Sequence, residues 1–241
     1  MRAGLKTRTW RRWAALAAVA LVVLLLGLWQ VSRARCFTLA GSITCRVETA
    51  QPLVALSFDD GPTESGVDAV LPVLGRYGVK ATFFLVGSEA ERRPDLVRRL
   101  VAAGQEIGNH SYSHQRMVAK GAAFYGAEID RTHAILMSAG APPPKLFRPP
   151  YGKKLIGLPL AVERRGYRLV TWDVEDPDDG RSDAIGYAAQ MVAEAKPGSI
   201  ILVHPMYPAN RRARQALPLV IDGLRARGLR IVTVGELLQT H

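Results

Sequence analysis

Two adjacent acids, Asp59 and Asp60, stand shortly after the apolar run 53–56 and directly before a Gly-Pro pair at 61–62. This order is typical of a buried strand that delivers charged side chains at its end and then turns sharply. Neighbouring residues of an extended chain point to opposite sides, so we expect the two acids to have different roles. The alternative is a solvated turn, the commoner meaning of Asp-Asp-Gly taken alone.

A pair of histidines, His110 and His114, follows another apolar segment that ends near residue 108. On a helical turn, histidines at positions i and i+4 lie on one face and can reach a single ion. The pair alone is weak evidence, because surface helices contain this spacing by chance. With a carboxylate such as Asp60 it supplies three protein ligands, which is the number expected at a catalytic zinc site with an open water position.

The remaining histidines differ in their surroundings. His204 ends the apolar run 200–203 and precedes a proline, so we expect it at the end of a buried strand, with a packed core histidine as the alternative reading. His133 lies within a predicted helix and His241 is the last residue. For these two we expect solvated or packing roles.

A further candidate is the segment 148–152, which begins with Arg148 and contains Tyr151. Its two prolines restrict the backbone just after a short predicted strand. This rigidity suits a loop that must hold an arginine or a backbone N–H in one place. A structural turn with an exposed arginine is the alternative.

The chain between these motifs alternates apolar runs with amphipathic stretches, which predicts a parallel sheet that is either open or closed into a barrel. In both architectures, active sites form at the carboxyl ends of the strands. The predicted strands cover 54–58, 81–87, 106–108, 145–148, 167–172, 199–203 and 230–234, and the predicted helices cover 65–77, 94–103, 119–138, 184–195 and 211–227.

The pattern of the N-terminal region predicts a membrane anchor. Residues 13–32 carry no charge and are long enough to cross a bilayer as a helix, and five basic residues precede them. Positive flanks stay in the cytoplasm, so we expect a cytoplasmic tail at 1–12, a single pass through the inner membrane, and the remaining chain on the periplasmic side. A cleaved signal peptide would leave a secreted protein, but the segment 31–35 that follows the apolar residues lacks a convincing small-x-small site.

Composition indicates one globular domain besides this anchor, since the 241 residues are 48% hydrophobic and 22% charged. Residues 1–35 hold seven basic residues and no acid, which leaves 25 basic and 21 acidic residues, or +4, of the total charge of +11. No basic run is interleaved with aromatic residues, so we expect no nucleic-acid binding. The sequence gives no indication of oligomeric state.

The two cysteines of the chain, Cys36 and Cys45, lie just after the apolar segment. In an oxidising compartment we expect them to close a small hairpin as a disulfide within a stem at 33–51, ahead of the globular domain at 52–241. Two free thiols are the alternative. A metal site is disfavoured, because no histidine adjoins them.

Taken together, four segments resemble the polysaccharide deacetylases, the NodB-homology domain of carbohydrate esterase family 4. The resemblance covers the chain from about residue 52 to the end and follows the order of the family's motifs. It implies a distorted (β/α) barrel of about seven parallel strands around a divalent metal. The segments are Ser57 to Pro62, His110 to His114, Arg148 to Gly152, and Leu202 to His204.

The resemblance also implies a role for each residue. Asp60, His110 and His114 would be the metal ligands, and Asp59 the catalytic base. Zn²⁺ is the expected ion, with Co²⁺ or Ni²⁺ also suited to two imidazoles and a carboxylate. Bound zinc lowers the pKa of water to roughly 7, so a nearby carboxylate can complete the deprotonation.

The other carried-over residues would complete the hydrolysis of an amide. Arg148 would pair with Asp59, and the backbone N–H of Tyr151 would meet the charge that develops on the amide oxygen. Leu202 would line the acyl pocket. His204 would act as the acid that protonates the leaving amine.

One family motif departs from the pattern. The family places an Asp-Trp pair a few residues after a Trp-containing strand, and counting from Trp172, a substrate-site residue, puts Asp178 at the Asp position and Asp179 at the Trp position. Asp178 would then support His204, with Asp173, Asp176 or Asp179 as alternatives. The missing Trp implies a more open or differently walled substrate site.

The leading hypothesis is a membrane-anchored, metal-dependent deacetylase that removes N-acetyl groups from an amino-sugar glycan of the chitooligosaccharide, peptidoglycan or poly-N-acetylglucosamine type. A deformylase or amidase acting on a lipid-linked or small substrate is the second. A glycan-binding module on an inactive barrel is the third, disfavoured because a binding module has no need of Asp59, Asp60 and His204 together.

Overall fold

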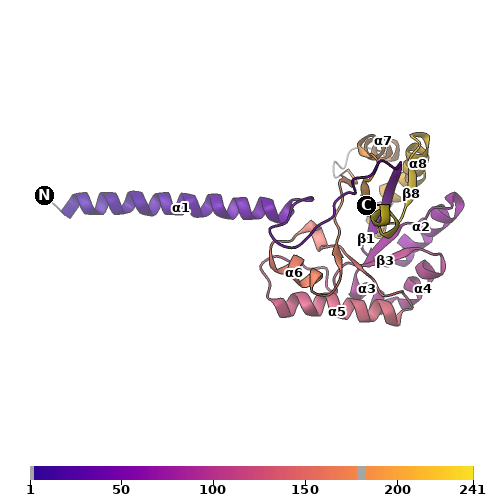
Figure 1. Ribbon diagram of the computed structural model, residues 1–241, viewed down its shortest axis with the longest axis horizontal. Coiled ribbons are helices and arrows are strands. Elements are labelled where there is room, and N and C mark those ends of the chain that lie inside the picture. Colours follow the sequence, from indigo (N-terminus) through magenta and orange to yellow (C-terminus); the bar gives the residue numbers. More distant parts are fainter. Residues whose placement is uncertain (1–2, 178–182, 241) are drawn as a thin grey trace.

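The computed structural model describes residues 3–177 and 183–240. A long helix, α1 (Ala3–Arg33), extends away from an α/β domain that contains the rest of the described chain (Figure 1). Within α1, the stretch Arg12–Arg33 is long and apolar enough to cross a membrane, and its apolar window is not buried against the domain. A signal sequence near an N-terminus has the same properties.

The domain is built on a curled sheet in which every described strand pair is parallel. The strand order is β5-β4-β3-β2-β1-β7-β6, and β8 pairs with the first half of β1. This agrees with the predicted barrel of about seven parallel strands. The strands are β1 (Leu53–Asp59), β2 (Thr82–Leu85), β3 (Glu106–Asn109), β4 (Leu146–Phe147), β5 (Arg168–Leu169), β6 (Val174–Glu175), β7 (Ile200–Val203) and β8 (Arg230–Val232).

Helices cover the outside of the sheet, with α5 and α6 on one side and α7 and α8 on the other (Figure 1). Sequence reasoning missed the short α3, α6 and α9, which are too brief to show a helical period. The helices of the domain are α2 (Glu64–Tyr77), α3 (Gly87–Arg92), α4 (Pro94–Ala102), α5 (Ala122–Ser138), α6 (Gly157–Glu163), α7 (Ala184–Glu194), α8 (Arg211–Ala226) and α9 (Val234–Leu237), with short 3₁₀ turns at Pro150–Gly152, Pro208–Asn210 and Leu238–Thr240.

The central strand β1 is buried along its whole length, which explains its continuous apolar run. Its even-numbered residues pack into the larger core cluster beside α2 and α8, whereas Leu53 and Ala55 pack into a second cluster on the opposite face, inside the curl. Asp59 is also an odd-numbered residue and lies on the same face of β1 as Leu53 and Ala55. The alternation of the strand therefore points Asp59 into the curl, and Asp60 follows where the strand ends.

The stem is attached to the domain. Cys36 and Cys45 form the predicted disulfide. On either side of Cys45, Thr44 forms a parallel bridge with Val170, and Arg46 forms an antiparallel bridge with Ser199. The stem thus adds backbone pairs to the sheet region rather than hanging free.

The predicted helical turn at His110 and His114 is wrong. The chain from residue 110 to 121 contains no helix, and both Ser111 and His114 adopt left-handed backbone conformations, with φ of 65° and 55°. The loop is held by Glu128 of α5, whose carboxylate accepts the backbone N–H groups of Tyr112 and Ser113 at 2.9 and 2.8 Å. These N–H groups therefore donate to a distant side chain in place of the carbonyl groups that they would reach in a helix.

Candidate active site

Three side chains converge at the carboxyl ends of β1 and β3. Potential ligand atoms of Asp60, His110 and His114 all lie within 4.8 Å of one another. The carboxylate oxygen of Asp60 is 3.3 Å from Nε2 of His114 and 4.0 Å from Nε2 of His110. A single loop after β3 brings the imidazoles together, because the turn at Ser111 replaces the helical spacing.

The chemistry of this donor set fits a divalent ion. Nδ1 of His110 lies 2.8 Å from the backbone carbonyl of Arg148, and a carbonyl only accepts, so Nδ1 carries the proton and Nε2 keeps its lone pair toward the site. Burial lowers the pKa of both His110 and His114, which favours the neutral form that a metal requires. Burial likewise raises the pKa of Asp60, as expected of a carboxylate in need of a cation.

The neighbouring Asp59 has a different partner. Its Oδ1 accepts a hydrogen bond of 2.7 Å from Arg148, and both side chains are buried. The guanidinium also donates to the backbone carbonyl of Thr171 at 3.0 Å and lies 4.0 Å from the ring centroid of Phe84. Burial, the largest single influence, raises the pKa of Asp59, but the charge and hydrogen bond of Arg148, together with the charges of His110 and His204, hold the pKa below its ordinary value. Asp59 is therefore ionised at neutral pH.

A second acid–base pair lies on the same rim. Nδ1 of His204, which follows β7, is 2.9 Å from Oδ1 of Asp176, which follows β6. Burial lowers the pKa of His204, but the hydrogen bond and charge of Asp176 overcome this and raise the pKa to about 9. Asp178, the predicted partner, and Asp179, one of the alternatives, lie outside the described residues. Among the alternatives predicted from the sequence, Asp176 makes this contact, whereas Asp173 accepts hydrogen bonds from Ser199 and the N–H of Ile200.

Tyr151 is 55% exposed and lies beside His114 of this cluster. Its ring centroid is 4.8 Å from that of His114, and its backbone is left-handed with φ of 59°. Trp172 lines the cleft beside it. Leu202 is fully buried in the core cluster inside the curl, to which Trp172 also belongs.

The cleft has a wall that the sequence did not predict. It is lined by residues from α1 as well as from the domain, namely Trp29, Arg33, Asp59, Asp60, His110, His114, Arg116, Tyr151, Lys153, Trp172, Glu175 and His204. A contact between α1 and the site had no signal in the sequence, because it depends on the direction of the chain after residue 33.

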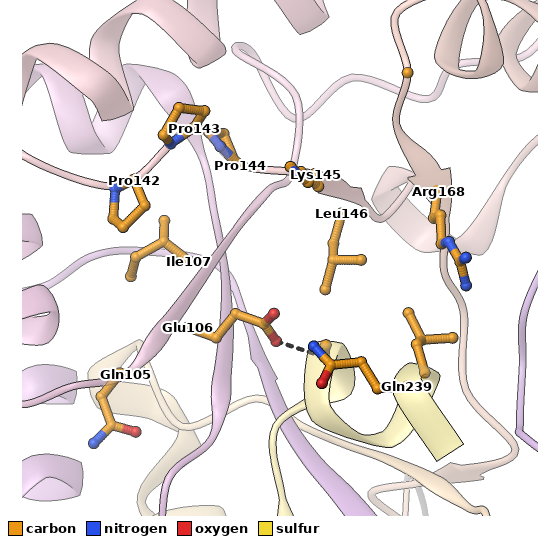
Figure 2. A pocket seen from close by; sticks show the side chains of 13 residues that line it. Gln105, Glu106, Ile107, Pro142, Pro143, Pro144, Lys145, Leu146, Arg168 and Gln239 are labelled. Atoms are coloured by element: carbon orange, nitrogen blue, oxygen red, sulfur yellow. Dashed lines mark hydrogen bonds between the residues drawn. The ribbon is translucent and has the colours of Figure 1, made fainter. Parts of the chain in front are cut away.

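Another pocket lies at the opposite edge of the sheet, near the starts of β3, β4 and β5 (Figure 2). There Glu106 accepts the backbone N–H of Gly235 at 2.9 Å, and three prolines at 142–144 form part of the wall. Its one acid is thus engaged at the start of α9, and its lining includes no histidine or cysteine. The cleft at the carboxyl ends of the strands is therefore a better candidate for the active site than this pocket.

A parallel α/β sheet with a carboxylate–dihistidine cluster, a paired buried Asp and a paired His at its carboxyl edge defines a metal-dependent hydrolase site. Comparison with known proteins identifies the family to which this hydrolase belongs. A family model described as polysaccharide deacetylase matches residues 46–170. The chain belongs to this family, the NodB-homology domain of carbohydrate esterase family 4.

Two curated relatives of this chain are also named as deacetylases. A peptidoglycan-N-acetylglucosamine deacetylase of Bacillus cereus is 35% identical over 188 residues, covering 78% of this chain and 68% of the relative. A chitooligosaccharide deacetylase of Sinorhizobium fredii is 33% identical over 207 residues, covering 81% and 95%.

Solved structures show the same fold. A peptidoglycan N-acetylglucosamine deacetylase has a TM-score of 0.78 at 32% identity, covering 83% of this chain and 94% of that one. A mutant of a family pseudoenzyme with restored enzymatic activity also has a TM-score of 0.78, at 26% identity, covering 84% of this chain and 73% of that one. Because one fold accommodates both active and inactive proteins, activity must be argued from the residues of the site.

Proposed function

We propose that this protein is a metal-dependent N-deacetylase that hydrolyses the N-acetyl amide of an amino-sugar glycan to acetate and a free amine. The observation that carries the proposal is the convergence of Asp60, His110 and His114 beside the Asp59–Arg148 and His204–Asp176 pairs. The named activities of the relatives in this family support the same reaction class.

Asp60, His110 and His114 would hold the ion, for which Zn²⁺ is our first choice and Co²⁺ or Ni²⁺ the alternatives. A divalent ion there supplies Lewis acidity that polarises the amide carbonyl and lowers the pKa of a water molecule. Asp59, ionised through its bond to Arg148, takes a proton from the attacking water. We assign the backbone N–H of Tyr151 as the donor to the developing oxyanion, a role supported by the place of this residue in the lining of the cleft.

His204 completes the proposed reaction. With Nδ1–H donated to Asp176 and a pKa of about 9, the ring is protonated at neutral pH. Its Nε2–H can then be transferred to the leaving nitrogen as the C–N bond breaks. Arg148 and Asp176 act through Asp59 and His204 and are positioning residues. We place Trp172 in the wall that receives the acyl group and sugar, whereas Leu202, predicted to line the acyl pocket, packs in the core cluster behind this wall.

We further propose that α1 anchors the protein in the inner membrane, with residues 1–12 in the cytoplasm, 13–32 in the bilayer and the stem and catalytic domain outside the cytoplasm. The uncharged apolar helix and the preceding basic residues support this orientation. The disulfide fits an oxidising compartment.

The test uses the full chain, purified in detergent with its disulfide intact and loaded with zinc. Acetate and formate release are measured with N-acetylglucosamine oligomers, peptidoglycan fragments, partly acetylated xylan and an N-formyl amino sugar, and metal content is measured in parallel. Acetate from an amino-sugar substrate supports the proposal. Formate from a formylated substrate would favour the deformylase, and a protein that binds no metal and releases neither acid would favour the inactive barrel.

A further inference from the structure

One wall of the cleft is formed by the end of α1. Trp29 and Arg33 line the cleft together with the catalytic residues. This end of α1 is fixed to the domain, because the N–H of Lys154 donates to the carbonyl of Ser32 at 3.1 Å. Just beyond, the hydroxyl of Thr171 donates to the carbonyl of Arg35 at 2.6 Å. A helix able to cross a membrane therefore contributes side chains directly to the site.

Lys153 is the unusual residue of this wall. It is only 7% exposed, and its ammonium group has no hydrogen-bond partner among the described residues. It lies 3.8 Å from the ring centroid of Trp29, which attracts the charge but accepts no ordinary hydrogen bond. A buried cation without an acceptor is costly. Burial, together with the charges of Arg33 and Arg116, also lowers its pKa.

The cleft is divided by charge. Its acids are Asp59, Asp60 and Glu175, of which Asp59 is paired with Arg148 and Glu175 with Arg35. Its positive charge comes from Arg33, Arg116 and Lys153, and the first two act on the third. The guanidinium of Arg116 lies 5.3 Å from the ring centroid of Tyr151, so the basic group borders the ligand set. Like charges gathered around a buried ammonium repel one another unless an anion binds among them.

From this arrangement we propose that Arg33, Arg116 and Lys153 form a subsite for a phosphoryl group that links the substrate's N-acyl amino sugar to a membrane lipid. The inference rests on the proposed function and specifies its substrate class. Arginine and lysine are suited to phosphate oxygens. Arg33 ends the apolar helix, where lipid phosphates lie once α1 spans a bilayer, so a phosphate there and a sugar over Asp60 and the histidines fit one cleft.

The experiment compares three substrates on the full-length, zinc-loaded protein in lipid nanodiscs. They are a polyisoprenyl-phosphate-linked N-acetylglucosamine, the water-soluble N-acetylglucosamine 1-phosphate, and uncharged chitotetraose. The variants are Lys153→Met and Arg33→Gln. Lys145→Met, which removes a charge at the opposite edge of the sheet, is the matched control.

We expect the wild type to prefer the lipid-linked phosphate in kcat/KM. Each variant should lose about 10- to 100-fold on that substrate, the range expected for one charge-assisted hydrogen bond, and should lose several-fold less on chitotetraose, which carries no phosphate. Lys145→Met should behave as the wild type. Equal losses on charged and uncharged substrates, or no preference for phosphate in the wild type, would overturn the subsite. A soluble phosphate as good as the lipid-linked one would overturn the membrane source.

A binding measurement separates this inference from the proposed function. Metal-free protein is titrated with polyisoprenyl phosphate that carries no sugar, and tryptophan fluorescence is followed, since Trp29 contacts Lys153. Saturable binding that Lys153→Met and Arg33→Gln weaken supports the subsite even for a protein that releases no acetate. Binding unaffected by both variants overturns it. Because Arg33 is exposed, Arg33→Gln keeps the test valid where Lys153→Met fails to fold.

Discussion

Replacing Asp176 by asparagine tests whether this acid sets the protonation of His204. The substitution keeps the shape of the side chain and removes the charge from the 2.9 Å contact. A hydrogen bond to a charged group contributes about 1.5–3 kcal/mol, and 1.36 kcal/mol corresponds to one pKa unit. The basic limb of the rate profile, which we place at about pH 9 from the raised pKa of His204, should therefore move about one to two pH units lower.

The direction of this shift in the basic limb follows from the proposed role of His204. His204 must be protonated to act as the acid, so activity is present below its pKa and lost as pH rises through it. At pH 9 the protonated fraction should fall from about a half to about a tenth or less, whereas at pH 6 it should stay at about nine-tenths or more. The assay is kcat/KM for acetate release between pH 5.5 and 10, which reports the free enzyme.

Asp222→Asn is the matched control, because that carboxylate accepts the Tyr77 hydroxyl on the exposed face of α8. It should leave the profile unchanged. A basic limb in Asp176→Asn that coincides with the wild type would refute the assignment and return the supporting role to Asp178 or Asp179.

Three further predictions concern the site and its support. Asp60→Ala should lose metal and activity together, whereas Asp59→Asn should keep the metal and lose most turnover; metal analysis and acetate release measure this. Tyr151→Gly should lower kcat by less than about tenfold, because glycine keeps the backbone N–H and accepts the left-handed conformation. Gly108→Ala should destabilise the domain by about 1–3 kcal/mol in thermal or urea unfolding, because the new Cβ would lie 2.5 Å from the ring of Phe84.

Each of these has a contrary result. Equal metal loss in Asp60→Ala and Asp59→Asn would contradict the assignment of Asp60 as a metal ligand and Asp59 as the base. A fall of a hundredfold or more in kcat for Tyr151→Gly would assign the role to the ring. Gly75→Ala is the control for Gly108→Ala, since no atom lies within 4 Å of its new Cβ, and equal stability of the two variants would contradict the packing argument.

The central strand and the two adjacent acids could be predicted from sequence because a continuous apolar run followed by charge has few structural solutions. The same holds for most of the longer helices, whose periods are clear. The loop at His110 could not be predicted in this way. Its conformation depends on Glu128, 14 or more residues away in the chain, and on a left-handed turn at Ser111.

The partner of His204 shows a second limit. Several acids follow Trp172, and spacing alone does not say which of them faces the histidine. In the structure Asp176 contacts His204, because β6 pairs with β7 and brings the ends of both strands together. This pairing was not predicted, since Val174–Glu175 is too short to be recognised as a strand.

The fixed junction between α1 and the domain has a consequence for how the protein would find its substrate. With Ser32 and Arg35 bonded to the domain and Cys36 tied to Cys45, no flexible stalk separates the helix from the cleft. A protein so held in a bilayer searches in two dimensions, with its cleft at one height and in one orientation. Turnover would then scale with the surface density of substrate in the membrane rather than with its bulk concentration.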